Sequence, residues 1–179
     1  MNFLQRLFRR QNDPTIHWGS FRPPLPDFDV GHMRFGPLSF GADLNEASFL
    51  GTPDRVGWGD SKKDYRVFLY APQGFEIGFE DGKFCSLYFL MGPDGCLPEH
   101  DALKFSQPRL RGGSLDGLTL TSQANEAALR EWFGEPESVD VDDEETILFY
   151  SRSGISMDFE LDGPTGVLKR WNLYTPDPA

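Results

Sequence analysis

The sequence predicts an α+β protein built from two tandem repeats, each a helix packed on a four-stranded antiparallel meander sheet. Two observations favour this fold. The chain matches itself at a shift of 80 residues, and each copy shows a helix stop followed by runs in which apolar and polar residues alternate. In addition, 39% hydrophobic and 14% aromatic residues among 179 are enough to form a packed core.

The internal match keeps the same order through both copies. Asn-Glu-Ala occurs at 45–47 and again at 125–127, and the alternating run 75–80 falls on 155–160. The second copy has three more residues before its helix stop, which is about one helical turn. We therefore divide the chain into an N-terminal extension (1–35), a first repeat (36–90), a linker (91–114), a second repeat (115–174) and a tail (175–179).

Each copy has signals for the start and the end of a helix. Asp43 with Glu46 three residues later forms a capping box, and Thr121 or Ser122 is expected to cap the second helix. Both helices are expected to end at a glycine followed two residues later by proline, at 51 and 53 and at 134 and 136.

Strands are expected after each helix stop. Alternation with one polar face is typical of antiparallel strands covered on one side only. The expected strands are 56–58, 66–70, 75–80 and 83–90 in the first copy, and 138–141, 146–150, 155–162 and 167–174 in the second.

This layout resembles the repeat unit of the β-lactamase inhibitor protein fold, and it is similar to the small lipoprotein of the outer-membrane assembly machine. The resemblance covers 36–90 and 115–174 and rests on the Gly-x-Pro stop and the following strands. It implies a sheet that presents an open face to a protein partner. Both families are exported, and the inhibitor's repeats contain disulfides that the second copy here cannot form, so neither role is transferred.

Charge and cysteine content narrow the classes of function. The net charge is −11, and residues 115–174 alone have a net charge of −9, which disfavours nucleic acid and favours a basic partner. Cys85 and Cys96 fit no disulfide framework, and we expect both to be thiols. The first ten residues place basic after apolar residues, unlike a secretory signal, so a cytoplasmic location without a membrane span is expected.

No pattern of catalytic or metal-binding residues stands out. The three histidines, His17, His32 and His100, belong to no nucleophile or ligand motif, and the acidic run 140–145 lacks the glycine and distant glutamate of a calcium loop. We therefore predict no enzyme, no metal and no cofactor.

The predicted outer sheet face is the candidate binding site. Its aromatic residues within an acidic field favour an interface with a cationic protein, as in an immunity protein of a bacterial toxin system. The residues are Glu76, Glu80, Tyr88, Asp158, Glu160, Arg170, Asn172 and Tyr174.

Two alternatives stay open. The same faces can pack the two repeats against each other and bury Tyr88 and Tyr174. The chain can also be a small-molecule binder or a hydrolase-type enzyme with a site in a cleft between the repeats, near residues 91–114 and His100. The sequence does not give the oligomeric state.

Overall fold

A computed structural model describes residues 13–20, 23–58, 64–93 and 104–176, and it shows a mostly β protein. The described residues form twelve strands in two sheets. The strands are β1 (Phe28–Asp29), β2 (Arg34–Phe35), β3 (Leu38–Ser39), β4 (Arg55–Trp58), β5 (Tyr65–Tyr70), β6 (Phe75–Glu80), β7 (Lys83–Leu90), β8 (Leu110–Arg111), β9 (Ser138–Val141), β10 (Glu145–Arg152), β11 (Ile155–Asp162) and β12 (Leu168–Tyr174).

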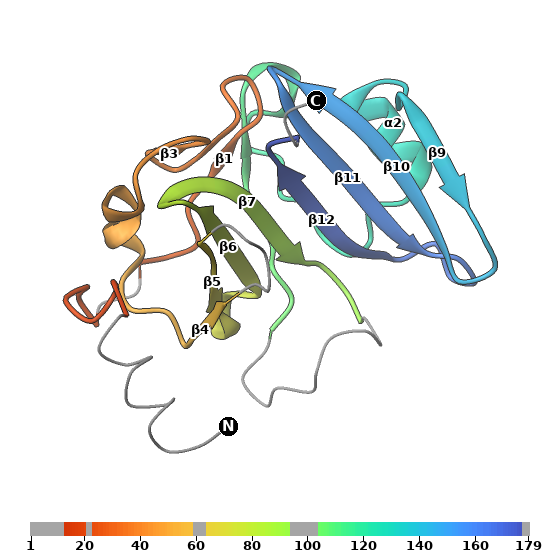
Figure 1. Cartoon of the computed structure of the whole chain (residues 1–179). Helices are drawn as coiled ribbons and strands as arrows, with labels where there is room; N and C mark the ends of the chain where they lie inside the picture. Colours follow the sequence, from red (N-terminus) through yellow and green to blue (C-terminus); the bar gives the residue numbers. More distant parts are fainter. Residues whose placement is uncertain (1–12, 21–22, 59–63, 94–103, 177–179) are drawn as a thin grey trace.

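The larger sheet has eight antiparallel strands in the order β4-β5-β6-β7-β12-β11-β10-β9 (Figure 1). Within each half, strands that follow one another along the chain are paired, and the halves meet where β7 pairs with β12. There Leu87 lies opposite Leu173 and Phe89 opposite Trp171. The backbone hydrogen bonds of both strands are thereby satisfied at the centre of the molecule.

The smaller sheet, in the order β3-β2-β1-β8, joins the N-terminal region to the segment before the second half. Its β1 pairs in parallel with β8, so that Phe28 lies opposite Leu110. The ring of Phe28 meets Trp171 edge-on with centroids 5.1 Å apart, and Phe35 meets Phe75 at 5.2 Å. The small sheet therefore packs on one face of the large sheet.

One continuous hydrophobic core lies on that face of the large sheet. Alternate residues of the strands point into it because successive side chains of a strand face opposite sides. Trp171 is fully buried at the junction and stacks on Phe89 and Phe159, with ring centroids 5.2 and 5.6 Å apart. The opposite side of the sheet is here called the outer face.

The predicted helix of the first half is a seven-residue 3₁₀ helix, η1 (Leu44–Leu50). It begins at Asp43, whose backbone N–H donates to Glu46 Oε1 at 2.9 Å, as the capping box predicts. It ends at Gly51, where φ is +73°. Shorter 3₁₀ helices, η2 (Ala71–Gln73) and η3 (Gly113–Leu115), are found at turns.

The second half has an α-helix, α2 (Glu126–Phe133), which lies behind β9–β12 in Figure 1. Its N-cap is Asn125, whose side-chain oxygen accepts from Ala128 N–H at 3.0 Å. The predicted caps Thr121 and Ser122 are wrong, because the helix begins several residues later. Gly134 ends the helix with φ +88°, at the predicted stop.

The predicted fold class, two α+β repeats of helix and meander, is wrong. Within residues 36–58 and 64–90 the structure shows only 3₁₀ turns in place of an α-helix, and the two strand runs form one sheet. A second sheet is formed by strands within residues 28–39 and 110–111. Most of these residues had been assigned to the N-terminal extension (1–35) and the linker (91–114). Alternation of apolar and polar residues identifies strands but not the strands that pair with them. For this reason the sequence did not indicate that the two runs of strands join in one sheet.

Candidate functional site

The candidate site is the outer face of the large sheet, and all eight predicted residues lie on it. The register gives one row in which neighbours are paired directly: Glu76 with Tyr88, Tyr88 with Asn172, and Asn172 with Asp158. Glu160 and Arg170 form a pair of the adjacent row, and Tyr174 lies opposite Ser86 in the row on the other side. Glu80 lies opposite Tyr65 on the same face.

Tyr88 and Tyr174 are each half-buried, and they lie side by side with other outer-face residues instead of between two packed sheets. The halves join through the edges of β7 and β12. The alternative in which the faces of two repeats pack against each other is therefore wrong.

Asn172 links two carboxylates at the centre of the face. Its side-chain nitrogen donates to Asp158 Oδ1 at 2.6 Å and to Glu160 Oε1 at 2.7 Å. Glu160 also forms an ion pair with Arg170, with an N–O distance of 2.9 Å. Asp158 is only 6% exposed and Glu160 8%, so both acids are held in fixed positions by hydrogen bonds and charge.

Burial raises the pKa values of the acids on this face. Desolvation raises the pKa of Asp158 to about 6, although its hydrogen bond with Asn172 acts in the opposite direction. Desolvation also raises the pKa values of Glu160 and Glu76. These groups lie on the outer face because the same alternation that places apolar residues in the core places them opposite.

The stability of the protein is expected to fall as pH rises through about 6, because of Asp158. Its folded-state pKa lies above the ordinary value of 3.8, so the folded chain binds this proton more tightly than the unfolded chain does. The contribution is complete below about pH 4 and is lost as the carboxyl ionises, at a cost of about 3 kcal/mol. The change Asp158→Asn should therefore stabilise the protein by about 2 kcal/mol near pH 7.5 and do little near pH 4.

Urea unfolding across this pH range measures the effect. The matched control is Asp142→Asn, because hydrogen bonds from the backbone of Glu145 and Glu144 lower the pKa of Asp142. That acid contributes stability that is lost as pH falls, so its replacement should leave the slope between about pH 5 and 8 unchanged. An Asp158→Asn protein with the wild-type slope would show that Asp158 ionises normally in the folded state.

Four further polar residues of the outer face were not predicted. The Tyr65 hydroxyl lies 3.0 Å from Ser86 Oγ, and Lys169 Nζ pairs with Glu145 Oε2 at 2.8 Å. Tyr65 and Glu145 each lie one residue before a predicted strand, and Ser86 lies two residues before Tyr88 in the predicted strand 83–90. The alternation of these strands would therefore have found all three. Lys169 lies at a register shift near Leu168, and no alternation identifies it.

Gly78 makes room for Tyr65 on this face. A Cβ atom at Gly78 would lie 2.6 Å from the Tyr65 hydroxyl oxygen and 2.1 Å from Ser86 Oγ. The missing side chain lets the phenol of Tyr65 reach across β6 to β7.

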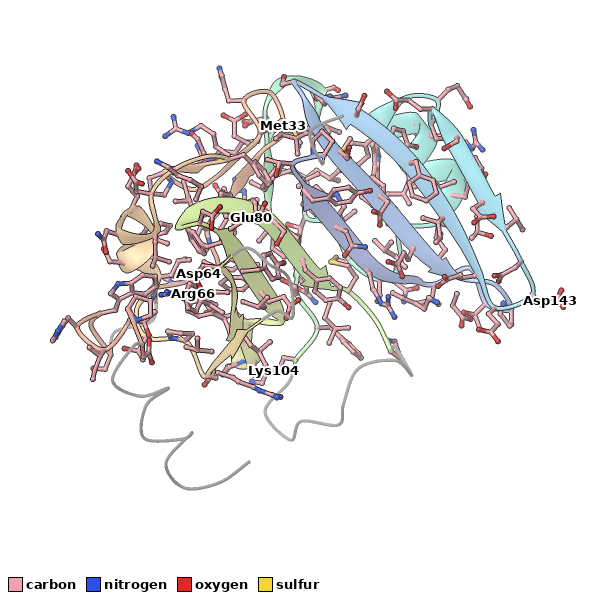
Figure 2. The ribbon with its side chains drawn as sticks, viewed as in Figure 1. Met33, Asp64, Arg66, Glu80, Lys104 and Asp143 are labelled. Carbon is pink, nitrogen blue, oxygen red and sulfur yellow. The ribbon has the colours of Figure 1, made fainter. Side chains whose placement is uncertain are left out.

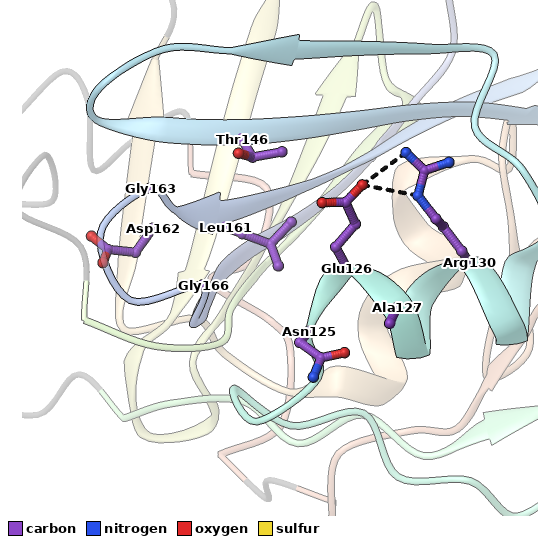
Figure 3. A pocket seen from close by; sticks show the side chains of 9 residues that line it. All are labelled: Asn125, Glu126, Ala127, Arg130, Thr146, Leu161, Asp162, Gly163 and Gly166. Atoms are coloured by element: carbon purple, nitrogen blue, oxygen red, sulfur yellow. Dashed lines mark hydrogen bonds and ion pairs between the residues drawn. The ribbon is translucent and has the colours of Figure 1, made fainter.

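A separate groove lies on the core side of the second half, between α2 and the turn after β11 (Figure 3). It has a volume of about 510 Å³ and is open to solvent. Glu126 and Arg130 of α2 face it and form an ion pair of 2.8 Å. This groove is not the cleft that was predicted between the repeats. At the place where the two halves meet, β7 and β12 pair directly, and His100 is outside the described residues.

Among the residues that the structure describes, no three His, Cys, Asp or Glu side chains are placed to hold a metal ion. The acidic run 140–145 forms a hairpin turn, in which Asp142 Oδ1 accepts from the N–H groups of Glu144 and Glu145 at 2.8 Å each. Cys96 lies outside the described residues, so the thiol state of the two cysteines stays a prediction. None of the described helices has the length and apolar character to span a membrane.

Comparisons with known proteins give no family. No protein-family model matches the chain, and no curated protein matches it. A DUF4309 family protein, YjgB of Bacillus subtilis, is 14% identical with a TM-score of 0.45, over 77% of this chain and 79% of that one. A cysteine-rich secretory protein of Staphylococcus aureus is 14% identical with a TM-score of 0.47, over 87% of this chain and 49% of that one. At these TM-scores neither likeness assigns a family or a function, and neither bears on the resemblance to the inhibitor fold.

Proposed function

We propose that this chain is a non-enzymatic protein-binding module that masks a basic partner with its outer face, in the manner of an immunity or inhibitor protein. The observation that supports the proposal is the position of eight polar and aromatic residues on one face of one continuous sheet, opposite the core. Tyrosines among carboxylates suit an interface, because the rings supply buried area and the charges speed encounter.

The charge of the outer face favours a cationic partner. Among the outer-face residues named above, five are acids, Glu76, Glu80, Glu145, Asp158 and Glu160. Two are cations, Lys169 and Arg170, and each of them pairs with one of the acids. The net charge of −11 extends this field over the whole chain. Long-range attraction of this kind raises association rates with basic proteins and weakens with salt.

The hydrogen-bonded network also lowers the cost of binding. Asn172, Asp158 and Glu160 are already held together, so fewer side chains lose conformational freedom when a partner docks. A partner cation near Asp158 would also favour its ionised form, so binding is expected to strengthen between about pH 5.5 and 7.5.

A charge-neutralised variant tests this function. Glu76→Gln with Glu80→Gln removes two outer-face charges with little change of shape, and it should weaken binding to a captured basic partner about tenfold at low salt. Partners are captured with the tagged full chain, and the affinity of each is then measured by titration at low and high salt.

The matched control neutralises two exposed acids outside the outer face and away from β9, Asp116→Asn with Glu131→Gln. It should bind nearly as well as the wild type. If both double variants weakened binding equally, the effect would come from the net charge of the chain. The outer face would then not be the binding site. Partners that are acidic, or binding that does not respond to salt, would contradict it directly.

The alternative, a small-molecule binder or hydrolase-type enzyme, is favoured by one observation, although not at the predicted cleft. Asp158 has a pKa of about 6 and shares Asn172 with Glu160, and a carboxyl near neutrality beside a second carboxylate can act in acid–base chemistry. Turnover of chromogenic ester or glycoside substrates by the wild type, abolished in Asp158→Asn, would favour the alternative over the binding module.

A further inference from the structure

One edge of the large sheet is open to solvent. In the described part of the chain β9 is the terminal strand and pairs only with β10. All four of its residues are exposed. An exposed edge strand presents unpaired backbone N–H and C=O groups, which proteins use to bind extended peptides.

The side chains that β9 directs to the core side are apolar but uncovered. Val139 lies opposite Leu148 and Val141 opposite Thr146, on the face that holds the core. Leu148 is fully buried, whereas Val139 is 40% exposed and Val141 66% exposed. The core face is therefore buried at β10 but largely exposed at the edge strand β9.

The opposite edge of the same sheet is covered. Val56 of β4 packs against the hydrophobic core. Its cross-strand neighbour Phe68 is fully buried beneath Trp18, with ring centroids 5.8 Å apart. Thr52 Oγ1 donates to the carbonyl of Trp18 at 2.9 Å and holds that segment in place. A segment from elsewhere in the chain therefore covers the apolar side of one edge, and β9 has no counterpart among the described residues.

The other side of β9 is acidic. Asp140 alternates with the two valines and lies opposite Ile147 on the outer face. Asp142 and Asp143 follow at the tip of the β9–β10 hairpin, where Figure 2 labels Asp143. The turn is fixed by the hydrogen bonds that Asp142 accepts, so the edge is already in the extended shape that a strand partner needs.

We propose that β9 is a docking edge for an extended peptide in which apolar and basic residues alternate, added as a ninth strand. Its apolar side chains would cover Val139 and Val141, and its cations would lie on the side of Asp140. The groove of Figure 3 opens on the same core side, and Thr146, the cross-strand neighbour of Val141, lines it.

A second copy of this chain fits the edge less well. Pairing β9 with β9 would bring Asp140, Asp142 and Asp143 of two chains close together, and facing like charges destabilise strand pairs. A basic strand removes that repulsion and adds attraction. The docking edge shares Asp140 with the outer face but includes none of the eight residues of the proposed binding site, so the docking proposal does not depend on the proposed function.

A synthetic peptide of seven residues with alternating lysine and valine is the probe. Titration of the isotope-labelled full chain should shift the amide signals of β9 and β10 in the NMR spectrum, with smaller shifts at β4. A peptide of the same composition with lysines and valines in separate blocks should bind at least tenfold more weakly, since only alternation matches the two sides of β9.

Backbone pairing is tested by methylating the peptide nitrogens. Amides of the valines point to one edge of the strand and those of the lysines to the other. Methylation of one set should abolish binding while methylation of the other leaves it within about threefold. Equal binding of both methylated peptides would overturn the proposal, because pairing with an edge strand cannot tolerate both.

Surface variants locate the site. Val139→Ser with Val141→Ser should weaken peptide binding about tenfold, and Asp140→Lys about threefold to tenfold. The controls are Ile16→Ser, another exposed apolar residue, and Asp116→Lys, an exposed acid away from β9. Loss of binding in the controls but not in the β9 variants, or dimerisation of the wild type without peptide, would contradict the assignment.

Discussion

Replacement of Trp171 by alanine is expected to lower the free energy of unfolding by about 3–5 kcal/mol, the usual cost of removing a fully buried large aromatic ring. Trp171 contacts three parts of the fold at once: Phe89 of the first half, Phe159 of the second and Phe28 of the small sheet. The cavity would therefore loosen the junction of the two halves. Urea unfolding followed by far-ultraviolet circular dichroism measures the loss.

Two controls sharpen this test. Trp171→Phe keeps a ring and should lose only about 1–2 kcal/mol. Its cavity is smaller, and the cost is partly offset because it removes an indole N–H that has no acceptor among the described residues. Trp132→Ala, at a half-buried position of α2, should lose less than Trp171→Ala. If Trp171→Ala unfolded in two separate transitions while the wild type unfolded in one, the result would show that Trp171 makes the two halves of the wild-type protein unfold together. A loss below about 1 kcal/mol would show that the junction does not depend on this ring.

Replacement of Gly74 by alanine is expected to lower the free energy of unfolding by about 3 kcal/mol. Gly74 has φ +68° and ψ 35°, the left-handed conformation, which costs a residue with a side chain about 1 kcal/mol. An added Cβ would also lie 2.0 Å from the carbonyl oxygen of Lys104. That segment would have to move, and the hydrogen bond from Lys104 N–H to the Ala71 carbonyl would be lost.

The sequence supplies the matched control for Gly74. Gly154 stands 80 residues later, also has a positive φ of +77°, and an added Cβ there meets no atom within 4 Å. Gly154→Ala should therefore cost only the conformational term of about 1 kcal/mol. Equal losses at the two positions, measured by urea unfolding, would show that the close approach to Lys104 has no energetic effect.

The strands of the large sheet could be predicted from the sequence because their alternation is strong. Ile77 and Phe79 in β6 are fully buried between half-buried Glu76 and Glu80, and the structure places β6 at the predicted residues. The organisation of the sheet could not be predicted. β7 and β12 have the same pattern as their neighbours, so nothing local distinguishes a partner within one half from a partner in the other.

The small sheet and the 3₁₀ form of η1 were not predicted, for different physical reasons. Strands of two residues, such as β1 and β8, are too short to show any periodicity. The capping box at Asp43 gives where a helical segment begins but not which kind of helix follows. With seven residues before Gly51, packing decides the geometry, and it selects the 3₁₀ form.

The sequence predicts which residues lie on the outer face, but not the hydrogen bonds and pKa shifts of those residues. Alternation alone placed Glu76, Tyr88, Asp158 and Asn172 on the polar side of their strands, and the register brings them into one row. The link from Asn172 to both carboxylates depends on the pairing of β11 with β12, and the burial that raises the pKa of Asp158 is a tertiary effect. Whether this face binds a basic protein stays a prediction.

The pairing of β7 with β12 also has a consequence for the newborn chain. β7 ends at Leu90, and β12 begins at Leu168, so the ribosome must add the whole intervening segment before β7 gains its neighbour. Until then strands β4–β7 present Phe89 and the unpaired backbone of β7, the kind of surface that recruits chaperones or drives aggregation. Synthesis that stalls before residue 168 would therefore release a fragment that is prone to aggregate.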